Sequence, residues 1–308
     1  MSKSPSFTDG VSHGKDDLEL LVLQVEDLPT MPVIAAQVYQ LLASDDVEIK
    51  DLTNVIMADP AVAARVVKIA NSSFYGTRRG IGTVSEAIMT IGFSALKGVV
   101  LHSALQDFYH PLGPTEAMLW EHSCAVAIAS RFLASHLGRS LADEAYLAGL
   151  VHDIGMQVLN WAAPDRFKQV MALHNSVNGP SIDAAERALY TFTHGEVGGR
   201  VLSKWHFPED LIIPVCYHHS FTTLLEGHTG SRSVSPGKSS PVYMTALVSL
   251  ADLFCLQLGL GYHRPFDDDL ARLPQAGYLG IDPDRMATLL EQFQEGYVKE
   301  WRNLMSLE

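Results

Sequence analysis

The sequence is poor in cysteine, which limits how the fold can be held together. Only three of its 308 residues are cysteines, at positions 124, 216 and 255. A disulfide framework needs an even number of cysteines at regular spacing, and this chain has neither. We therefore expect three buried thiols in a protein that folds in a reducing cytosol.

The sequence is also short of positive charge. Lys and Arg together number 22 against 35 Asp and Glu, which gives a formal net charge of -13. Nucleic-acid phosphates and anionic lipid surfaces are both recognised by clustered Lys and Arg. This balance predicts a protein with no nucleic-acid partner and no membrane-surface partner.

Long uninterrupted apolar runs are missing as well. The longest candidates, near Val99–Leu105 and Thr245–Leu260, are too short or too interrupted for the roughly 18 apolar residues of a membrane span. The first residues contain no apolar run that could serve as a signal peptide. The 47% hydrophobic content favours a packed core over disorder. We expect a soluble, cytoplasmic protein.

What the sequence does contain is helical periodicity. From residue 18 onward, apolar residues recur at intervals of three and four, whereas few stretches alternate as strands do. Helix-start signals support this pattern: Asp59 precedes Pro60, and Thr193 with Glu196 forms a capping box. The expected helices cover residues 33–43, 49–57, 60–73, 85–91, 95–106, 116–137, 143–161, 193–205, 208–219, 242–258 and 283–304. The prediction is an all-α fold with a flexible tail over residues 1–17 and a flexible loop over 227–241.

Imidazole and carboxylate groups recur in order within these otherwise apolar helices. The series is His122, His152, Asp153, His194, His218, His219 and Asp252. Burying such groups without partners costs about 1–3 kcal/mol for a neutral group and more for a charged one. A shared divalent metal removes that cost, since imidazole and carboxylate are ligands that such ions prefer. On a continuous helix His152 and Asp153 would point about 100° apart, so a metal would have to lie over the helix edge between them.

The sequence contains thirteen His, and an isolated His on an apolar helix is more often an ordinary core or surface residue than a ligand. We give that interpretation to His13, His102, His110, His136, His174, His206, His228 and His263. Asp252, taken alone, could also be a buried hydrogen-bond acceptor. The ordered series distinguishes the candidate residues from these others.

That order resembles the HD superfamily of metal-dependent phosphohydrolases, in which a His, a His–Asp pair and a distal Asp hold a metal in a helical core. The upstream segments LPTMP (28–32), ADPAVAARVVKIANSSFYG (58–76) and VSEAIMTIGFSALKGVVL (84–101) resemble the HDOD domain, the HD-related output domain of bacterial signalling proteins. The resemblance covers residues 28 to 219, about two-thirds of the chain.

The resemblance implies an HDOD fold, with an N-terminal helical subdomain over residues 18–115 and an HD-type helical bundle over 116–308. It also implies a bacterial regulatory module that is usually not an enzyme and often has lost its metal ligands. Here the seven candidate residues match positions that bind metal in intact HD proteins. In contrast, Met156 stands where the HD-GYP phosphodiesterases carry Lys, and no GYP run follows His219. The ligand positions are kept while the substrate-binding positions are not recognisable.

Three hypotheses follow. The first is a regulatory module with a protein partner in a signalling pathway, in which the site either retains one or two divalent ions (Fe, Mn, Zn or Ni) or is an empty remnant. In this module the NSSFYG stretch, with Arg78 and Arg79, is either a contact surface or a helix C-cap. The second is a phosphohydrolase or phosphodiesterase acting on a nucleotide or cyclic dinucleotide. There His122, His152, Asp153 and Asp252 would hold one ion, and Asp153 would bridge to a second ion at His194 and His218.

In that second hypothesis His219 would be a ligand or a proton donor. Arg200 and Lys204, further along the helix of His194, would be candidates for phosphate contact, although a solvated helix face accounts for both. The third hypothesis is an oxygen-using di-iron site, which HD folds can host and which no residue here singles out.

Overall fold

The structure is a computed structural model in which residues 31, 33–44, 46–72, 75, 80–109, 113–138, 140–227, 240–261 and 266–305 are described, with backbone only for 107 and 298–305. Within these residues every regular element is a helix, which confirms the all-α class. The three cysteines are free; Cys124 and Cys255 are buried and Cys216 is half-buried.

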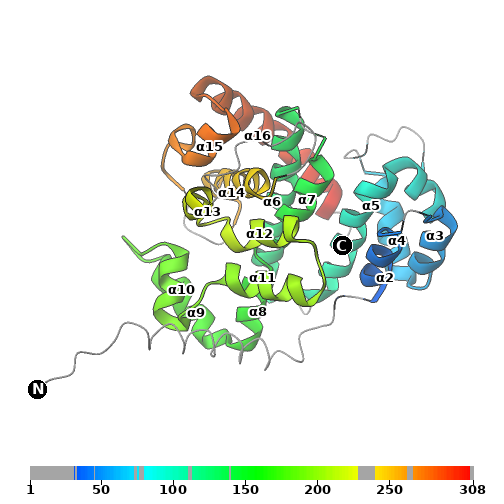
Figure 1. The fold of residues 1–308 in the computed structure, drawn as a ribbon, viewed down its shortest axis with the longest axis horizontal. Helices are drawn as coiled ribbons and strands as arrows, with labels where there is room; N and C mark the ends of the chain where they lie inside the picture. The colour runs from blue at the N-terminus through cyan, green and yellow to red at the C-terminus, as the bar shows by residue number, and fades with distance from the viewer. Residues whose placement is uncertain are drawn as a thin grey trace, which may run out of the picture.

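Four helices near the N-terminus pack on one another. They are α2 (Val33–Leu41), α3 (Ile49–Met57), α4 (Pro60–Ala70) and α5 (Val84–Phe108). The Asp59 carboxylate accepts from the Ala61 and Val62 amides and so caps α4, as the sequence predicts. These helices lie at one end of the molecule, where α5 contacts α7 (Ala142–Val151) of the larger bundle (Figure 1).

Helix α5 is broken at Gly92, whose φ of 80° and ψ of 171° are accessible essentially only to glycine. This agrees with the prediction of two separate helices over residues 85–91 and 95–106. Residues Val84–Gln106 are nevertheless long and apolar enough, with a mean hydropathy of 1.5, to cross a membrane by length and composition. The expectation that no segment reaches the length and apolarity of a membrane span was therefore too strong. Half of the most apolar window is buried within the fold, as in a core helix.

The larger bundle surrounds two long apolar helices, α6 (Pro114–His136) and α14 (Pro241–Gln257), which contact each other. Around them pack α7 (Ala142–Val151), α8 (Ile154–Ala162), α11 (His194–Lys204) and α12 (Glu209–Tyr217). The predicted capping box is present, because the Thr193 side chain accepts from the Glu196 amide and the Glu196 side chain accepts from the Thr193 amide.

The remaining elements complete the outside of this bundle. They are α9 (Pro164–His174), α10 (Ile182–Tyr190), α13 (Phe221–Gly227), the short 3₁₀ helix η3 (Leu270–Arg272), α15 (Pro274–Leu279) and α16 (Pro283–Met305). Of these, only α16 is predicted from the sequence pattern. Helices α9 and α10 lie beside α8 and α11, opposite the N-terminal helices in Figure 1.

The single helix predicted over residues 143–161 is wrong. Helix α7 ends at Val151, and Asp153, with φ of -103° and ψ of 16°, begins a new helix, α8. The pattern missed this break because apolar residues continue on both sides of it and the nearest glycine, Gly155, stands two residues beyond Asp153. The break changes the directions in which the His152 and Asp153 side chains point.

Several expectations fall outside the described residues. These are the 1–17 tail, all but Met31 of the LPTMP segment, most of NSSFYG with Arg78 and Arg79, and most of the 227–241 loop. His13, His110, His228 and His263 also lie there. The boundary between residues 115 and 116 stays a prediction; α6 begins at Pro114.

Candidate metal centre

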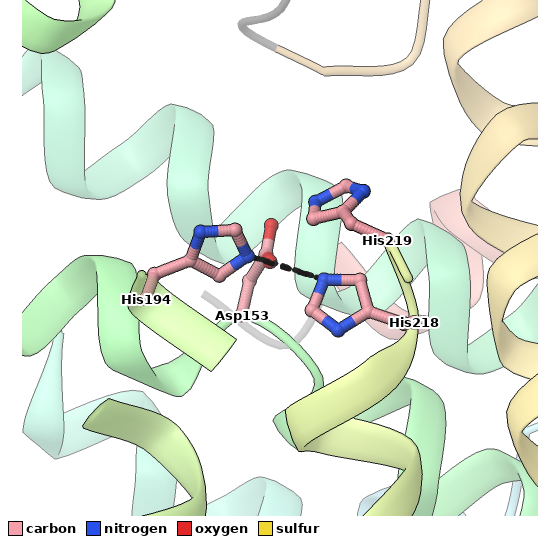
Figure 2. Close-up of side chains that lie close together, drawn as sticks. All are labelled: Asp153, His194, His218 and His219. Carbon is pink, nitrogen blue, oxygen red and sulfur yellow. Dashed lines mark hydrogen bonds and ion pairs between the residues drawn. The ribbon is translucent and has the colours of Figure 1, made fainter. Parts of the chain in front are cut away.

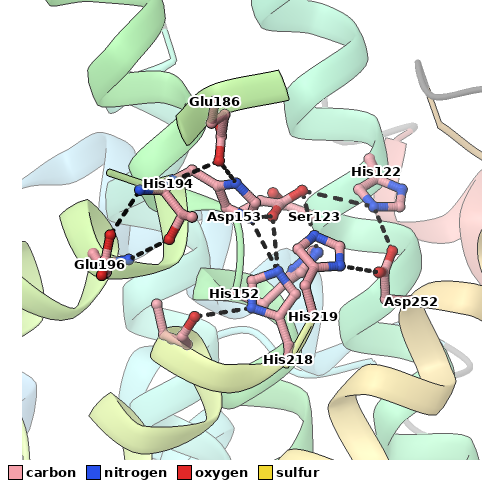
Figure 3. Close-up of polar contacts among 12 residues, drawn as sticks. His122, Ser123, His152, Asp153, Glu186, His194, Glu196, His218, His219 and Asp252 are labelled. Carbon is pink, nitrogen blue, oxygen red and sulfur yellow. Dashed lines mark hydrogen bonds and ion pairs between the residues drawn. The ribbon is translucent and has the colours of Figure 1, made fainter. Parts of the chain in front are cut away.

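The seven predicted side chains converge in the middle of the larger bundle. His122 comes from α6, His152 and Asp153 from the α7–α8 junction, His194 from the first turn of α11, His218 and His219 from the end of α12, and Asp252 from α14. Six of them are at most 2% exposed, and only His219 is partly open to solvent. Their arrangement appears in Figure 3. Segments that are up to 130 residues apart in the chain, such as His122 and Asp252, meet here.

Asp153 lies at the centre of the cluster. Its Oδ1 is 3.3 Å from His194 Nε2 and 3.4 Å from His218 Nε2. Its Oδ2 is 3.3 Å from His152 Nε2 and 3.8 Å from His122 Nε2. Figure 2 shows His194 and His218 reaching this carboxylate from either side. One carboxylate thus faces two different sets of imidazoles, one with each oxygen.

Two groups of possible metal ligands share Asp153. The first consists of His122, His152 and Asp153, and the second of Asp153, His194, His218 and His219; within each, the donor atoms lie within 4.8 Å of one another. Asp252 adjoins the first group, since its Oδ1 is 3.1 Å from His122 Nε2 and its Oδ2 is 3.9 Å from His219 Nδ1.

The break between α7 and α8 explains how adjacent His152 and Asp153 both face the centre. A continuous helix would separate their directions by about 100°. Close packing of α8 on α11 fixes the junction, because a Cβ at Gly155 would overlap the His194 carbonyl oxygen and lie 2.8 Å from the Gly198 amide nitrogen. Glycine at position 155 therefore lets the backbone carrying Asp153 approach the backbone carrying His194.

Four of the imidazoles are held in one tautomer by partners on their outer side. The Nδ1–H groups of His122, His152 and His218 donate to the backbone oxygens of Leu260 (2.8 Å), Gly149 (2.7 Å) and Val215 (2.9 Å), respectively. A carbonyl oxygen only accepts, so each Nδ1 carries the hydrogen and each Nε2 presents a lone pair inward when the ring is neutral.

Glu186, on α10, accepts the Nδ1 hydrogen of His194 and so fixes the tautomer of the fourth ring. The sequence did not predict this residue. Its Oε2 accepts from His194 Nδ1 at 2.8 Å and from the His194 amide at 2.9 Å, and its side chain is fully buried. A carboxylate behind a metal-binding His orients the ring and raises its basicity. Two signals could have found the element: Ser181 as an N-cap, which the structure confirms, and Pro164 as the first residue of the neighbouring α9.

The inner atoms of the cluster require a positive charge. His194 Nε2 and His218 Nε2 are 3.2 Å apart, and with both Nδ1 atoms protonated two lone pairs would face each other in the neutral state. Among the described residues, His152 Nε2, Asp153 Oδ1 and Asp252 Oδ2 are buried without a hydrogen-bond partner. Leaving such atoms unpaired costs about 1–3 kcal/mol each. A divalent cation or bound protons would satisfy them.

The pKa shifts show how strongly the cluster attracts positive charge. Burial lowers the pKa of His194, but the charge of Glu186 and the nearby Asp153 carboxylate outweigh burial and hold that pKa well above its usual value. Burial likewise lowers the pKa of His122, yet Asp252 raises it on balance. Burial alone would raise the pKa of Asp153. The neighbouring imidazoles, His152 first, lower it by more, so the pKa of Asp153 lies well below its usual value.

His219 behaves differently from the other imidazoles. Burial, and then the charges of His218 and His194, place its pKa well below the usual value. Its side chain is 20% exposed, whereas the others are almost fully enclosed. Its ring centroid lies 4.1 Å from that of His218 and 5.0 Å from that of His194. This residue is therefore the most accessible group of the cluster.

The histidines interpreted as ordinary lie elsewhere. His102 and His174 are buried beside Tyr146 and the Pro180 carbonyl, at 2.9 Å in each case, while His136 and His206 are exposed. Arg200 and Lys204 are exposed on α11, and Met156 is fully buried in the core.

The sequence pattern of the HDOD domain matches residues 28–221 of this chain. The chain belongs to the HDOD domain family. His122 to His219 lie inside the matched HDOD region, whereas Asp252 lies beyond it. The extent of the match agrees with the resemblance inferred from residues 28 to 219.

Solved structures support the same fold. An HDOD domain protein of unknown function from Geobacter sulfurreducens superimposes with a TM-score of 0.78 at 24% identity, covering 97% of this chain and 99% of that one. A candidate phosphohydrolase from Shewanella amazonensis gives 0.70 at 20% identity, covering 94% and 98%. A candidate signal transduction protein from Marinobacter aquaeolei gives 0.68 at 23% identity, covering 98% and 66%.

Among curated sequences, an uncharacterised protein of Treponema pallidum is 22% identical over 198 residues. These residues make up 64% of this chain and 38% of that protein, so the chain matches well under half of its relative's length.

Proposed function

We propose that this chain is a regulatory HDOD module of a signalling pathway that retains an HD-type site for one or two divalent metal ions. One observation supports the metal site. Four histidines around the Asp153 carboxylate donate their Nδ1 hydrogens outward, so that their Nε2 atoms point inward. The donors are imidazole and carboxylate, which suits first-row ions such as Fe, Mn, Zn or Ni.

In this proposal His122, His152, Asp153 and Asp252 would hold one ion, and Asp153 would also serve a second ion at His194 and His218. His219 is either a further ligand or a proton donor at the accessible side. Glu186 does not bind the ion; it fixes the ring of His194 from behind. When bound, the metal supplies Lewis acidity and lowers the pKa of a bound water.

A regulatory rather than catalytic role is favoured by the enclosure of the site. The side chains of Asp153 and Asp252 are 3% and 1% exposed, so a phosphate ester has little access to them in this conformation. The basic side chains that could receive phosphate, Arg200 and Lys204, are exposed on α11. The Marinobacter homologue described as a candidate signal transduction protein is consistent with a protein partner in signalling.

A phosphohydrolase acting on a nucleotide or cyclic dinucleotide is the second candidate. It is favoured by one observation, the sharing of Asp153 between two groups of donors, since two-metal hydrolases clamp a phosphoryl group between neighbouring ions. The Shewanella homologue described as a candidate phosphohydrolase supports the same possibility.

Metal analysis of protein purified without added ions tests the site. We expect near-stoichiometric metal in the wild type and in Asp165→Asn, an exposed carboxylate on α9, but only trace metal in Asp153→Asn. Trace metal in the wild type would contradict the proposed metal site. Retention of metal in Asp153→Asn would mean that the site lies elsewhere.

Activity is tested separately on metal-reconstituted protein, with bis(4-nitrophenyl) phosphate and cyclic dinucleotides as substrates. The regulatory assignment predicts no turnover above that of Asp153→Asn. Turnover that disappears in this variant would establish the hydrolase instead.

A further inference from the structure

A second feature of the molecule lies away from the His/Asp cluster. A cavity of about 790 Å³ opens where the N-terminal helices α2 and α5 meet α7, α14 and the turn between α11 and α12. Pockets that enclose small molecules typically measure about 300–1,000 Å³ and often lie between packed units. The cavity is thus large enough for a drug-sized or metabolite-sized ligand.

The floor of the cavity is apolar and well packed. Leu147, Leu211 and Met244 are at most 8% exposed and belong to three different helices. The wall adds aromatic rings: Tyr39 meets Phe207 edge-on at 5.0 Å between centroids, and Trp205 lies 6.4 Å from Phe207. This surface suits a flat or hydrocarbon body, and electron-rich ring faces also attract organic cations.

The rim of the cavity is predominantly acidic. Among the described lining residues, three carboxylates (Asp143, Glu144 and Asp210) face one lysine, Lys97. Asp143 already pairs with Arg131 at 3.5 Å, whereas Glu144 and Asp210 are exposed and form no ion pair within the described part of the chain. The rim therefore offers negative charge that the described structure does not neutralise.

The turn between α11 and α12 carries backbone strain at this wall. His206 has a φ of 61°, in the left-handed region that favours glycine. The Phe207 amide donates to the Leu202 oxygen and the His206 amide to the Ser203 oxygen, both at 3.0 Å, which together form a Schellman C-cap. Glycine is the common residue at this position, so the imidazole is present despite a conformational cost. Strained residues of this kind cluster at ligand sites.

We propose that this cavity binds a small amphipathic organic cation, with its apolar body on the Leu147–Leu211–Met244 floor and its positive charge at the Glu144–Asp210 rim. The aromatic wall favours a positive charge near ring faces, and the acidic rim disfavours an anionic ligand. The bound molecule would contact helices from both ends of the chain. It would also contact the turn that joins the helices carrying His194 and His218.

Calorimetric titration of the full chain with tryptamine and phenethylamine tests this proposal. The matched anion indole-3-propionate keeps the ring and reverses the charge. We expect saturable binding of at least one amine and none of the anion. Asp210→Asn should weaken amine binding roughly 2- to 5-fold, the range of an exposed charge pair.

Ala36→Trp, which fills the cavity from α2, should abolish binding, while Ala64→Trp on the exposed face of α4 should not. Binding should persist in Asp153→Asn, which separates this cavity from the proposed metal site. The proposal would be overturned if neither amine binds or if indole-3-propionate binds as tightly as the amines. It would also be overturned if both single variants, Ala36→Trp and Asp210→Asn, bind the amine as the wild type does.

Discussion

At the scale of single residues, burial distinguishes the acidic groups that organise the site from those that cover the surface. Asp153, Asp252 and Glu186 are at most 2% exposed, and each lies within 3.4 Å of at least one imidazole nitrogen. The sequence pointed to the first two because each occurs in an apolar helical stretch. Glu186 lies in the segment AAERALY, where a Glu beside an Arg resembles a solvated helix face, so its burial became evident only from the packing of α10 on the site.

Glu186→Gln tests the role of that carboxylate. The amide is a weaker acceptor for His194 Nδ1–H, so the ring should be less firmly oriented and less basic. We expect metal affinity to fall by about 10- to 100-fold while the helical circular dichroism signal stays unchanged. Glu209→Gln, an exposed acid in the first turn of α12, serves as the control. Equal metal affinity in the two variants would show that Glu186 does not strengthen metal binding through His194.

His102 provides a pH prediction outside the cluster. Burial, followed by the charge of Arg65, lowers its pKa from 6.5 to about 4. Between those values the unfolded chain binds the proton more readily than the folded one. The free energy of unfolding is therefore highest above pH 6.5 with respect to this group, and decreases as the pH falls toward 4, by up to about 3 kcal/mol.

Urea unfolding between these two pH values measures that slope. His102→Asn removes the titrating group while keeping an acceptor near the Tyr146 hydroxyl, and it should flatten the slope. His136→Asn, at an exposed site on α6, controls for loss of an imidazole. A slope in His102→Asn as steep as in the wild type would contradict the assignment.

At the scale of helices, local signals predicted most starts, but not the break that builds the site. Asp59 and Thr193 cap their helices through side-chain bonds within three residues, which a sequence displays directly. The His152–Asp153 break instead depends on the approach of α8 to α11 at Gly155, a contact between segments some 40 residues apart in the chain. Such contacts leave no local pattern apart from the small side chain itself.

Gly155→Ala tests this close approach. The added methyl would overlap the His194 carbonyl oxygen, so α8 and α11 must separate. We expect a loss of about 1–3 kcal/mol in the free energy of unfolding, together with a reduced metal content. Gly277→Ala in α15 meets no atom within 4 Å and should leave stability unchanged or raise it by up to about 1 kcal/mol. Similar behaviour of the two variants would contradict the proposed crossing.

At the scale of the whole molecule, the resemblance predicted the family and the all-α architecture, while the ordered His and Asp series predicted which side chains meet. Neither could show how the units pack. The cavity between α2, α5 and the α11–α12 turn depends on residues far apart in the chain, and no motif marks it. The exposure of individual groups, such as His219 against His218, likewise arises only from packing.

Chelation tests the metal as a structural crosslink of the larger bundle. An ion at Asp153 would join α6, the α7–α8 junction, α11, α12 and α14. These elements are spread over residues 114–257 of the chain. At free metal about 1,000-fold above its dissociation constant, binding stabilises the fold by about 4 kcal/mol, or roughly 6 °C in melting temperature. EDTA should remove that increment in the wild type and have no effect in Asp153→Asn. An unchanged wild-type melting temperature would contradict this crosslink.

Anomalous X-ray scattering tests most directly whether the Asp153 carboxylate binds metal. Crystals of protein reconstituted with Mn²⁺ or Zn²⁺ should show one or two anomalous peaks at about 2.0–2.2 Å from the Asp153 oxygens, within reach of the inward Nε2 atoms. A map without a peak at Asp153, in crystals whose protein was supplied with metal, would contradict metal binding at this carboxylate.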